Sequence, residues 1–359
     1  MAIEDILNWR NISASVQRVL TGIPNRLPPA FMNIKEDVLG DRTTYVQFYG
    51  QRALARRAEY GAPSRARTLR PLADKTVTLC HFAEHIKLRH ELLLRLRNPN
   101  DLVAQTMAQT EIARHGADLR TLFDNTRIAA IASALANGRI WFDVGGNVLP
   151  TASGAFHTID YRVPANNLNQ LNGIIAASWA TASTPIIQQI ENLRIRMAQT
   201  TGRELKYCLY GSNIANYLFT NDTLKAYWQY APAMYQSFAN SPETVPNGFA
   251  GLTWIRVGDM FFEDADGVSR SLFGADTASF MPEIDSNFYT MYEGSILVPK
   301  SYGISANSTA ALSNFEIVYG MGGYAVPELD PVGIKETYFD TFLPHFKIPE
   351  DLYIGDVTP

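Results

Sequence analysis

Several features that assign a protein to a class are missing from this sequence. Cysteine occurs only at Cys80 and Cys208 among 359 residues, too few for a disulfide framework, so we expect a reducing compartment. No apolar run approaches the ~20 residues of a membrane-spanning helix, and the N-terminus, MAIEDILNWR, carries acidic residues where a secretion signal is basic. We therefore expect a globular chain of two or three units sharing a core, with no membrane partner.

Histidine is also scarce, and one catalytic pattern is built on it. Residues 80–85, CHFAEH, contain H-x-x-E-H, the inverted signature of zinc peptidases. That chemistry needs a helix, on which both histidines share a metal and the glutamate activates its water. The preceding KTVTL alternates like a strand, on which Glu84 points away from His81 and His85. We expect a partly exposed strand, and a zinc peptidase is an alternative that stoichiometric zinc would support.

No other motif predicts a catalytic residue, a metal or a cofactor. Gly145-Gly146 is followed by no Lys-Ser/Thr pair, which argues against a phosphate-binding loop and favours a hairpin turn. An EF-hand over residues 262–273 would have phenylalanine at its first and twelfth ligand positions, so Asp266-Gly267 is expected to be a hairpin turn. We therefore expect a protein that is not an enzyme and that needs no cofactor.

Charge is distributed unevenly along the chain. Residues 1–97 carry sixteen Lys and Arg against nine Asp and Glu, whereas residues 259–359 carry four against sixteen. The basic residues concentrate in one polar run, at Arg52, Arg56, Arg57, Arg65, Arg67 and Arg70. A basic head and an acidic tail attract other copies of the chain in head-to-tail contacts, so we predict an inter-subunit contact at these arginines. The run lacks the aromatic residues of a base-stacking groove, and a nucleic-acid-binding module is an alternative that salt-dependent DNA binding would support.

A long polar excursion precedes the first extended periodic segment. Residues 1–45 contain a short amphipathic helix and the Pro-rich stretch GIPNRLPPAF. Two predicted strands, at residues 44–48 and 76–86, then frame the tip YGAPSRART. A hairpin this long with so few core residues is not stable in isolation, so we expect it to lie on another surface.

One very long helix follows. Apolar periodicity predicts it over residues 102–137, after an N-cap at Asn100 or Asp101 and before a C-terminal cap at Asn137-Gly138. At 1.5 Å per residue it is ~54 Å long, and without a strict heptad it indicates a spine rather than a coiled coil.

Shorter elements make up the rest of the chain. We expect helices at residues 185–199 and 212–230, and strands at residues 140–144, 156–163, 204–210, 252–257, 314–319, 332–342 and 352–357. The sequence thus predicts an α+β chain with an extended basic hairpin, one spine helix and a separate α/β insert.

Segments spread over residues 45–359 carry a resemblance to a known family. They are RALARRAEYGAPSRARTLRP, NPNDLVAQTMAQTEIARHGADLRTLFDNTRIAAIASALANG, RIWFDVGGNVLP, FHTIDYRVP, YGSNIANYLFTNDTLKAYW, ADGVSRSLFGAD and LPHFKIPEDLYIGDV. In this order they resemble the major head (capsid) proteins of tailed phages, which have the Hong Kong 97 fold, and most closely the lambda head-protein branch. The resemblance implies an N-terminal arm (1–46), an extended loop with its return strand (47–97), a peripheral domain with spine helix and hairpin (98–165), an axial domain (166–305) and closing peripheral strands (306–359).

The resemblance also implies a function and partners. Copies of the chain would form hexamers and pentamers of an icosahedral phage head around double-stranded DNA contacted non-specifically. A separate scaffolding protein, a portal protein and a decoration protein are the further expected partners. The protein would lie in the virion, and in the host cytoplasm during assembly. An encapsulin-like compartment of the same fold is the alternative, which co-purified cargo would support.

The N-terminal arm has an expected role as a strap. Because the extended loop begins near residue 47, we expect no removable scaffolding segment before it and an intact chain in the mature shell. The expected anchor is the apolar cluster Ile6, Leu7 and Trp9, and the residues expected to keep its link extended are Pro24, Pro28 and Pro29.

Overall fold

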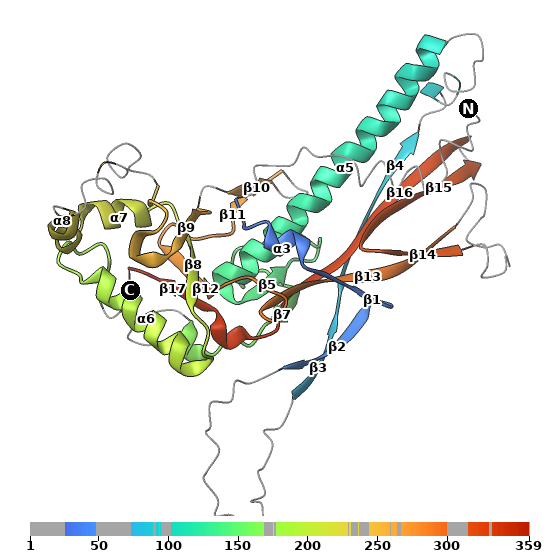
Figure 1. Ribbon diagram of the computed structural model, residues 1–359. Helices are drawn as coiled ribbons and strands as arrows, with labels where there is room; N and C mark the ends of the chain where they lie inside the picture. The colour runs from blue at the N-terminus through green and yellow to red at the C-terminus, as the bar shows by residue number, and fades with distance from the viewer. Residues whose placement is uncertain are drawn as a thin grey trace, which may run out of the picture.

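In the computed structural model, two large sheets and one very long helix surround a shared core (Figure 1). The structure describes residues 26–47, 73–88, 91–92, 94, 102–168, 175, 177–228, 230, 236, 244–258, 260–263, 267–299, 315–329 and 332–358. No helix within these ranges is both long and apolar enough to cross a membrane.

The larger sheet has six strands. They are β1 (Lys35–Val38), β4 (Cys80–Leu88), β13 (Tyr289–Pro299), β14 (Phe315–Tyr319), β15 (Met321–Leu329) and β16 (Val332–Phe346). The long strand β16 organises the sheet, since it pairs antiparallel with β4, β13 and β15. Residues 291–294 of β13 also pair in parallel with β1, and residues 295–299 pair antiparallel with β14.

The predicted spine helix is α5 (Leu102–Asn137), and its C-terminal end is where the sequence places it. Gly138 has a φ of 67°, and its N–H donates to the Ala134 carbonyl at 2.8 Å. A glycine accepts this left-handed conformation without the steric cost of a Cβ, which explains the stop. The predicted N-cap residues Asn100 and Asp101 lie outside the described residues.

α5 lies along the six-stranded sheet (Figure 1). Ile112 and Phe123 of the helix form one apolar cluster with Ile334 and Tyr338, which are four residues apart on β16 and share one face of the strand. Side chains alternate between the faces of a strand, so this cluster defines the face of β16 that the helix covers. Residues 127–136 of the helix are all buried, and therefore its C-terminal part lies inside the molecule.

The smaller sheet has four strands in the order β17-β12-β8-β9. Its elements are β8 (Leu205–Tyr210), β9 (Thr253–Arg256), β12 (Thr277–Pro282), β17 (Tyr353–Asp356), and the nearby helices α6 (Ile186–Thr200), α7 (Ile214–Thr220) and α8 (Asp222–Trp228). A second apolar cluster joins these parts around Trp179, Phe280 and Tyr353. The predicted strands at 204–210 and 252–257 and the predicted helix at 185–199 are confirmed.

Short elements complete the described chain. They are α3 (Ala30–Asn33), β2 (Arg42–Gln47), β3 (Ala73–Thr78), β5 (Arg139–Phe142), β6 (Val148–Leu149), β7 (His157–Asp160), β10 (Phe261–Glu263), β11 (Ser269–Ser271), and the 3-10 helices η1 (Ala165–Asn167), η3 (Phe249–Gly251) and η5 (Pro349–Asp351). The pairing of β5 with β7 confirms the predicted strand pair after the helix, with β6 as an additional strand. The pairing of β10 with β11 confirms a hairpin around Gly267.

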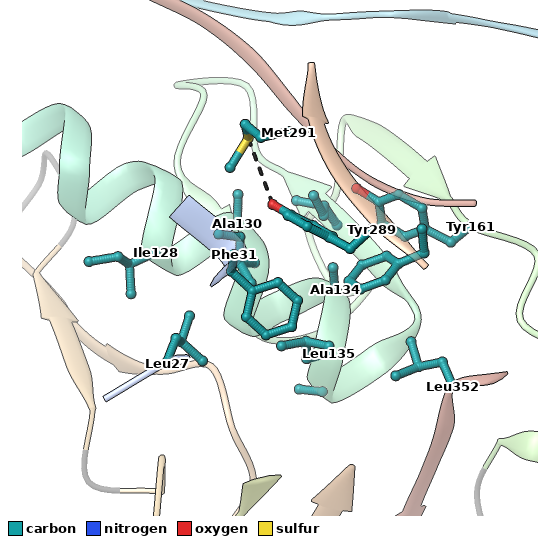
Figure 2. Close-up of a cluster of buried hydrophobic side chains, with 14 of the residues drawn as sticks. Leu27, Phe31, Ile128, Ala130, Ala134, Leu135, Tyr161, Tyr289, Met291 and Leu352 are labelled. Carbon is teal, nitrogen blue, oxygen red and sulfur yellow. Dashed lines mark hydrogen bonds between the residues drawn. The ribbon is translucent and has the colours of Figure 1, made fainter. Parts of the chain in front are cut away.

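The end of the arm is part of the main core (Figure 2). Leu27 and Phe31 are buried among α5 and β13, and the Phe31 ring meets the Tyr289 ring edge-on at 4.8 Å. Pro29 has helical dihedral angles and is the N-cap of α3, so the expectation that Pro29 keeps this link extended is wrong. Proline is favoured at a helix start because its missing N–H has no partner there.

The other residues of the expected strap are outside the part of the chain that the structure describes. They are Ile6, Leu7, Trp9 and Pro24.

The helix predicted over residues 212–230 is instead two helices, α7 and α8. They meet at Asn221, whose side-chain oxygen accepts a hydrogen bond from the Leu224 N–H at 3.0 Å. Asn221 also donates to the Thr184 carbonyl at 2.9 Å, and it is fully buried. A buried N-cap of this kind overrides the apolar periodicity that runs through both helices.

The closing strands differ most from prediction. β15 is an additional strand that is not among those predicted from the sequence. Its glycines and Pro327 are unfavourable in a central strand, and it lies at the sheet edge. β16 continues to Phe346, beyond the expected end at residue 342. β17 pairs with β12, so this last strand of the range 306–359 lies in the four-stranded sheet and not beside β14, β15 and β16. Conversely, β13, from the expected axial range, belongs to the six-stranded sheet.

Candidate assembly surfaces

The base of the predicted extended hairpin is present. β2 and β3 pair antiparallel, from Arg42 opposite Thr78 to Gln47 opposite Ala73. The hairpin continues directly into β4 and thus into the six-stranded sheet. The predicted contact residues lie in the part beyond this base, outside the described residues: Arg52, Arg56, Arg57, Arg65, Arg67 and Arg70.

The H-x-x-E-H pattern lies on β4, which confirms the predicted strand. His81 Nδ1 is 2.8 Å from the Thr341 hydroxyl of β16, and His85 lies opposite Thr337. Glu84 occupies the other face of the strand, so the three side chains do not have the helical arrangement of a zinc peptidase. Throughout the described ranges, no group of three or more His, Cys, Asp and Glu side chains could hold a metal ion.

The two cysteines are both free thiols. Burial raises the pKa of Cys208 well above its ordinary value, and burial together with the Asp340 charge raises the pKa of Cys80 to about 12. A thiol must be a thiolate to act as a nucleophile or a metal ligand. Both residues therefore behave as small apolar side chains.

The most concentrated charges of the described chain form a network that sequence reasoning missed. Arg127, on the buried face of α5, donates to both carboxylate oxygens of Asp340 on β16, each at 2.6 Å. Its remaining terminal nitrogen donates to Glu293 of β13 at 2.7 Å. Lys35 of β1 donates to the same Glu293 oxygen at 2.7 Å. One ionic network thus joins the arm strand, the sheet and the spine helix.

Because the network is buried, each of its charges requires a partner of opposite sign. The side chains of Arg127 and Asp340 are 3% and 0% exposed. Burial by itself lowers the pKa of Arg127, but the charges and hydrogen bonds of Asp340 and Glu293 raise it above its ordinary value. Burial likewise raises the pKa of Glu293, yet Arg127 and Lys35 bring the net value below the ordinary one. Arg127 and Glu293 therefore stay charged near neutral pH, and each depends on its partners.

One sequence signal pointed to this network. Arg127 is the single charged residue in the run RIAAIASALA, which otherwise reads as a buried helix. A charged residue on a buried face requires a partner of opposite sign, but its identity is not local information. Asp340 and Glu293 are 213 and 166 residues away along the chain.

The acidic tail is less available to other subunits than its composition suggests. Four of its carboxylates are buried, namely Glu293, Glu336, Asp340 and Asp351. Two more pair with basic residues of the middle segment: Asp285 with Arg203 at 2.7 Å, and Glu283 with Lys206 at 2.6 Å. Within the described residues, Glu263, Glu283 and Asp356 are the exposed carboxylates of the tail.

Three comparisons relate this geometry to known proteins. A family model described as phage major capsid protein E matches residues 19–311 of this chain. A search of curated protein sequences finds no match.

Solved structures are similar to this chain at low sequence identity. A phage-related protein from Bordetella bronchiseptica RB50 is 8% identical, with a TM-score of 0.51 over 98% of this chain and 97% of its own. A prophage protein from E. coli CFT073 is 11% identical, with a TM-score of 0.47 over 79% of each chain. A capsid chain of cyanophage P-SCSP1u is 12% identical, with a TM-score of 0.42 over 94% of this chain and 90% of its own. The Bordetella protein thus has the same fold over nearly the whole chain.

Proposed function

This chain belongs to the phage major capsid protein E family, and from that premise we propose how its copies build a shell. It is a capsid shell protein with the α+β fold of Hong Kong 97-type capsids. We propose that it forms the hexamers and pentamers of an icosahedral head that encloses double-stranded DNA. The observation that carries the proposal is the family match, which extends through the hairpin, the spine helix, three strands of the six-stranded sheet and three strands of the four-stranded sheet.

The proposed division of labour follows the two sheets. We assign the six-stranded sheet, α5 and the hairpin to a peripheral unit, and the four-stranded sheet with α6, α7 and α8 to an axial unit. The core formed by α5, β12, β13 and β17 supports this assignment, since it lets the two units act as one rigid tile. A tile that must repeat contacts around five- and sixfold positions needs a fixed shape and no catalytic centre.

The proposed shell contact pairs the Arg-rich hairpin of one subunit with an acidic surface of its neighbour. Exposed Glu263 and Asp356 support such a surface, in smaller form than the tail's net charge suggests, because exposed Glu283 already pairs with Lys206. Further proposed partners follow the resemblance to the lambda head-protein branch: a separate scaffolding protein, a portal protein, a decoration protein and the packaged DNA. The protein belongs to the virion, and we propose that assembly takes place in the host cytoplasm.

Electron microscopy of the expressed and purified protein tests the proposed function. Closed icosahedral shells with hexameric and pentameric units are expected, either from the chain alone or after co-expression with a phage scaffolding protein. Shells that reproducibly contain one cargo enzyme and do not bind a portal protein would support the encapsulin-like alternative. A protein that stays monomeric under both conditions would contradict the assembly proposal.

A further inference from the structure

Residues 295–299 of β13 and the strand β14 form a two-stranded ladder with one exposed face. The residues of this face, here called the outer ladder face, are Ser295, Leu297, Pro299, Phe315, Ile317 and Tyr319. They pair directly across the two strands, Leu297 with Ile317 and Ser295 with Tyr319. Leu297 is 56% exposed, Ile317 44% and Tyr319 36%. None of the six positions carries a charge.

The opposite face of the same ladder is already occupied. Val298 and Val318 are buried against Phe339 of β16, with Ile296 and Tyr324 packed around them. The ladder is therefore held on the six-stranded sheet by its inner side. On the outer ladder face, Ser295 accepts a hydrogen bond from the Gly40 N–H at 2.7 Å. Leu297, Ile317 and Tyr319 belong to none of the apolar clusters that the described residues form. Directly paired apolar side chains form a continuous surface, in contrast to a single exposed leucine.

The ladder also lies at a margin of the molecule. In Figure 1, β14 projects away from β15 and β16 at the end opposite to α6 and α8. Within the described residues β14 pairs with β13 alone, so it is an edge strand. An apolar edge strand is a liability in a protein that stays monomeric, and natural monomers normally protect it with charges.

From these observations we infer that the outer ladder face is an apolar contact between two copies of this chain in the shell. The inference rests on the proposed function, because only a shell places other copies around each subunit at high density. The face cannot serve the packaged DNA, whose phosphates require Lys and Arg. It is equally unsuited to the Arg-rich hairpin, since no carboxylate is present to pair with a guanidinium. The contact is thus distinct from the proposed ionic one and relatively insensitive to salt.

Site-specific thiol labelling tests the inference. Leu297→Cys and Ile317→Cys are each prepared, with Val298→Cys as the matched control from the inner face of the same ladder. Maleimide labelling of free subunits and assembled shells is quantified by mass spectrometry of the modified peptides, which separates each new thiol from Cys80 and Cys208. We expect fast labelling of the two outer positions in subunits. In shells, the labelling rate of both positions should fall by about tenfold or more, because burial in an interface excludes the reagent. Val298→Cys should label slowly in both states.

Two results would overturn the inference. One is equal labelling of the outer positions in subunits and shells. The other is slow labelling already in the free subunit, which would mean that the chain's own residues cover the face. A second variant, Ile317→Lys, should give a folded subunit that fails to close shells, whereas Ile317→Val should assemble; normal shells from Ile317→Lys would also contradict the inference. Failure of the unmodified chain to form any shell would count against the proposed function instead.

Discussion

Arg127 shows how much one buried side chain determines in this fold. Its guanidinium reaches two carboxylates on two strands and also lies 5.3 Å from the centre of the Phe342 ring. A planar guanidinium with five donors suits this task, whereas a lysine would satisfy one carboxylate at a time. The position of α5 on the sheet is therefore fixed by a specific ionic contact in addition to apolar packing.

Replacing Arg127 should destabilise the subunit strongly. Arg127→Met leaves Asp340 and Glu293 buried without their main counter-charge, which costs about 3–5 kcal/mol of unfolding free energy. Lys35→Met is the control, because Lys35 contacts the same Glu293 carboxylate while its own side chain is 42% exposed. Such a partly exposed pair contributes only ~0–1 kcal/mol. Urea unfolding of the unassembled subunits measures both values, and similar losses from the two variants would contradict the assigned role of Arg127.

Glu336 predicts a pH dependence of stability. It is fully buried, its Oε2 atom accepts a hydrogen bond from Tyr338 at 3.0 Å, and burial raises its pKa to about 7. The folded subunit therefore holds this proton more tightly than the unfolded chain does. The stabilisation is complete below the ordinary pKa of about 4.5 and is lost as the pH rises to about 7.

Glu336→Gln should remove this dependence. The amide stays neutral, so the variant should lose less stability than the unmodified chain between pH 5 and pH 8, by a difference on the order of 2 kcal/mol. Urea unfolding of free subunits at several pH values measures it. Burial also raises the pKa of Asp351, to about 6, and this residue is unchanged in both proteins, so its contribution cancels in the comparison. Parallel pH profiles would show that Glu336 is not the group responsible.

At the scale of elements, the turn between β14 and β15 meets β13 at two glycines. Gly320 links β14 to β15 and donates its N–H to the Gly294 carbonyl of β13 at 2.9 Å. Gly320 has a φ of 65°, and a Cβ there would lie 2.8 Å from the Glu293 carboxylate carbon. The Glu293 carboxylate of the ionic network therefore lies directly against the turn at Gly320, where a side chain larger than that of glycine would displace it.

Gly320→Ala should reveal this shared space. The left-handed conformation costs an alanine roughly 1–2 kcal/mol, and displacement of the Glu293 carboxylate adds to that cost. Gly146→Ala is the matched control, since Gly146 has a φ of 84° but no atom within 4 Å of its added Cβ. Thermal unfolding of the two variants should show a clearly larger loss for Gly320→Ala. Equal losses would mean that backbone strain is the only effect and that Glu293 adjusts freely.

At the scale of the whole molecule, two kinds of surface are proposed to act in assembly. The Arg-rich hairpin and the exposed carboxylates are ionic, whereas the outer ladder face is apolar. Salt weakens the first kind and leaves the second largely unaffected. A shell that uses both combines directional attraction during assembly with burial of apolar area once the neighbours meet.

The ionic contact can be tested by charge reversal. Each exposed pair contributes only ~0–1 kcal/mol, but the contact is repeated throughout a shell, so its loss is felt cooperatively. Replacing Arg65, Arg67 and Arg70 together with Glu should give folded subunits that fail to form closed shells. The same three positions changed to Lys should still assemble, because the charge is retained. Sedimentation velocity and electron microscopy distinguish the outcomes, and normal particles from the Glu variant would show that this contact is wrong.

The sequence by itself determined those features whose signals are local. The end of α5 follows from apolar periodicity and a glycine at position 138, and β4 follows from alternation that continues through the H-x-x-E-H pattern. The order of segments carries the resemblance to capsid proteins, which the family match confirms. Caps, turns and periodicity act over a few residues, so they are legible without a structure.

Only the tertiary structure decided which distant segments meet. The parallel pairing of β1 with β13, the transfer of β17 to the four-stranded sheet and the Arg127 network all join residues far apart along the chain. The stability of a strand depends on the neighbours that cover its faces and edges, as β15 shows at the sheet edge. The acidic tail illustrates the same limit: the sequence shows its net charge but not the burial of each carboxylate. Which carboxylates are buried and which are exposed depends on the cationic side chains that the fold brings to them.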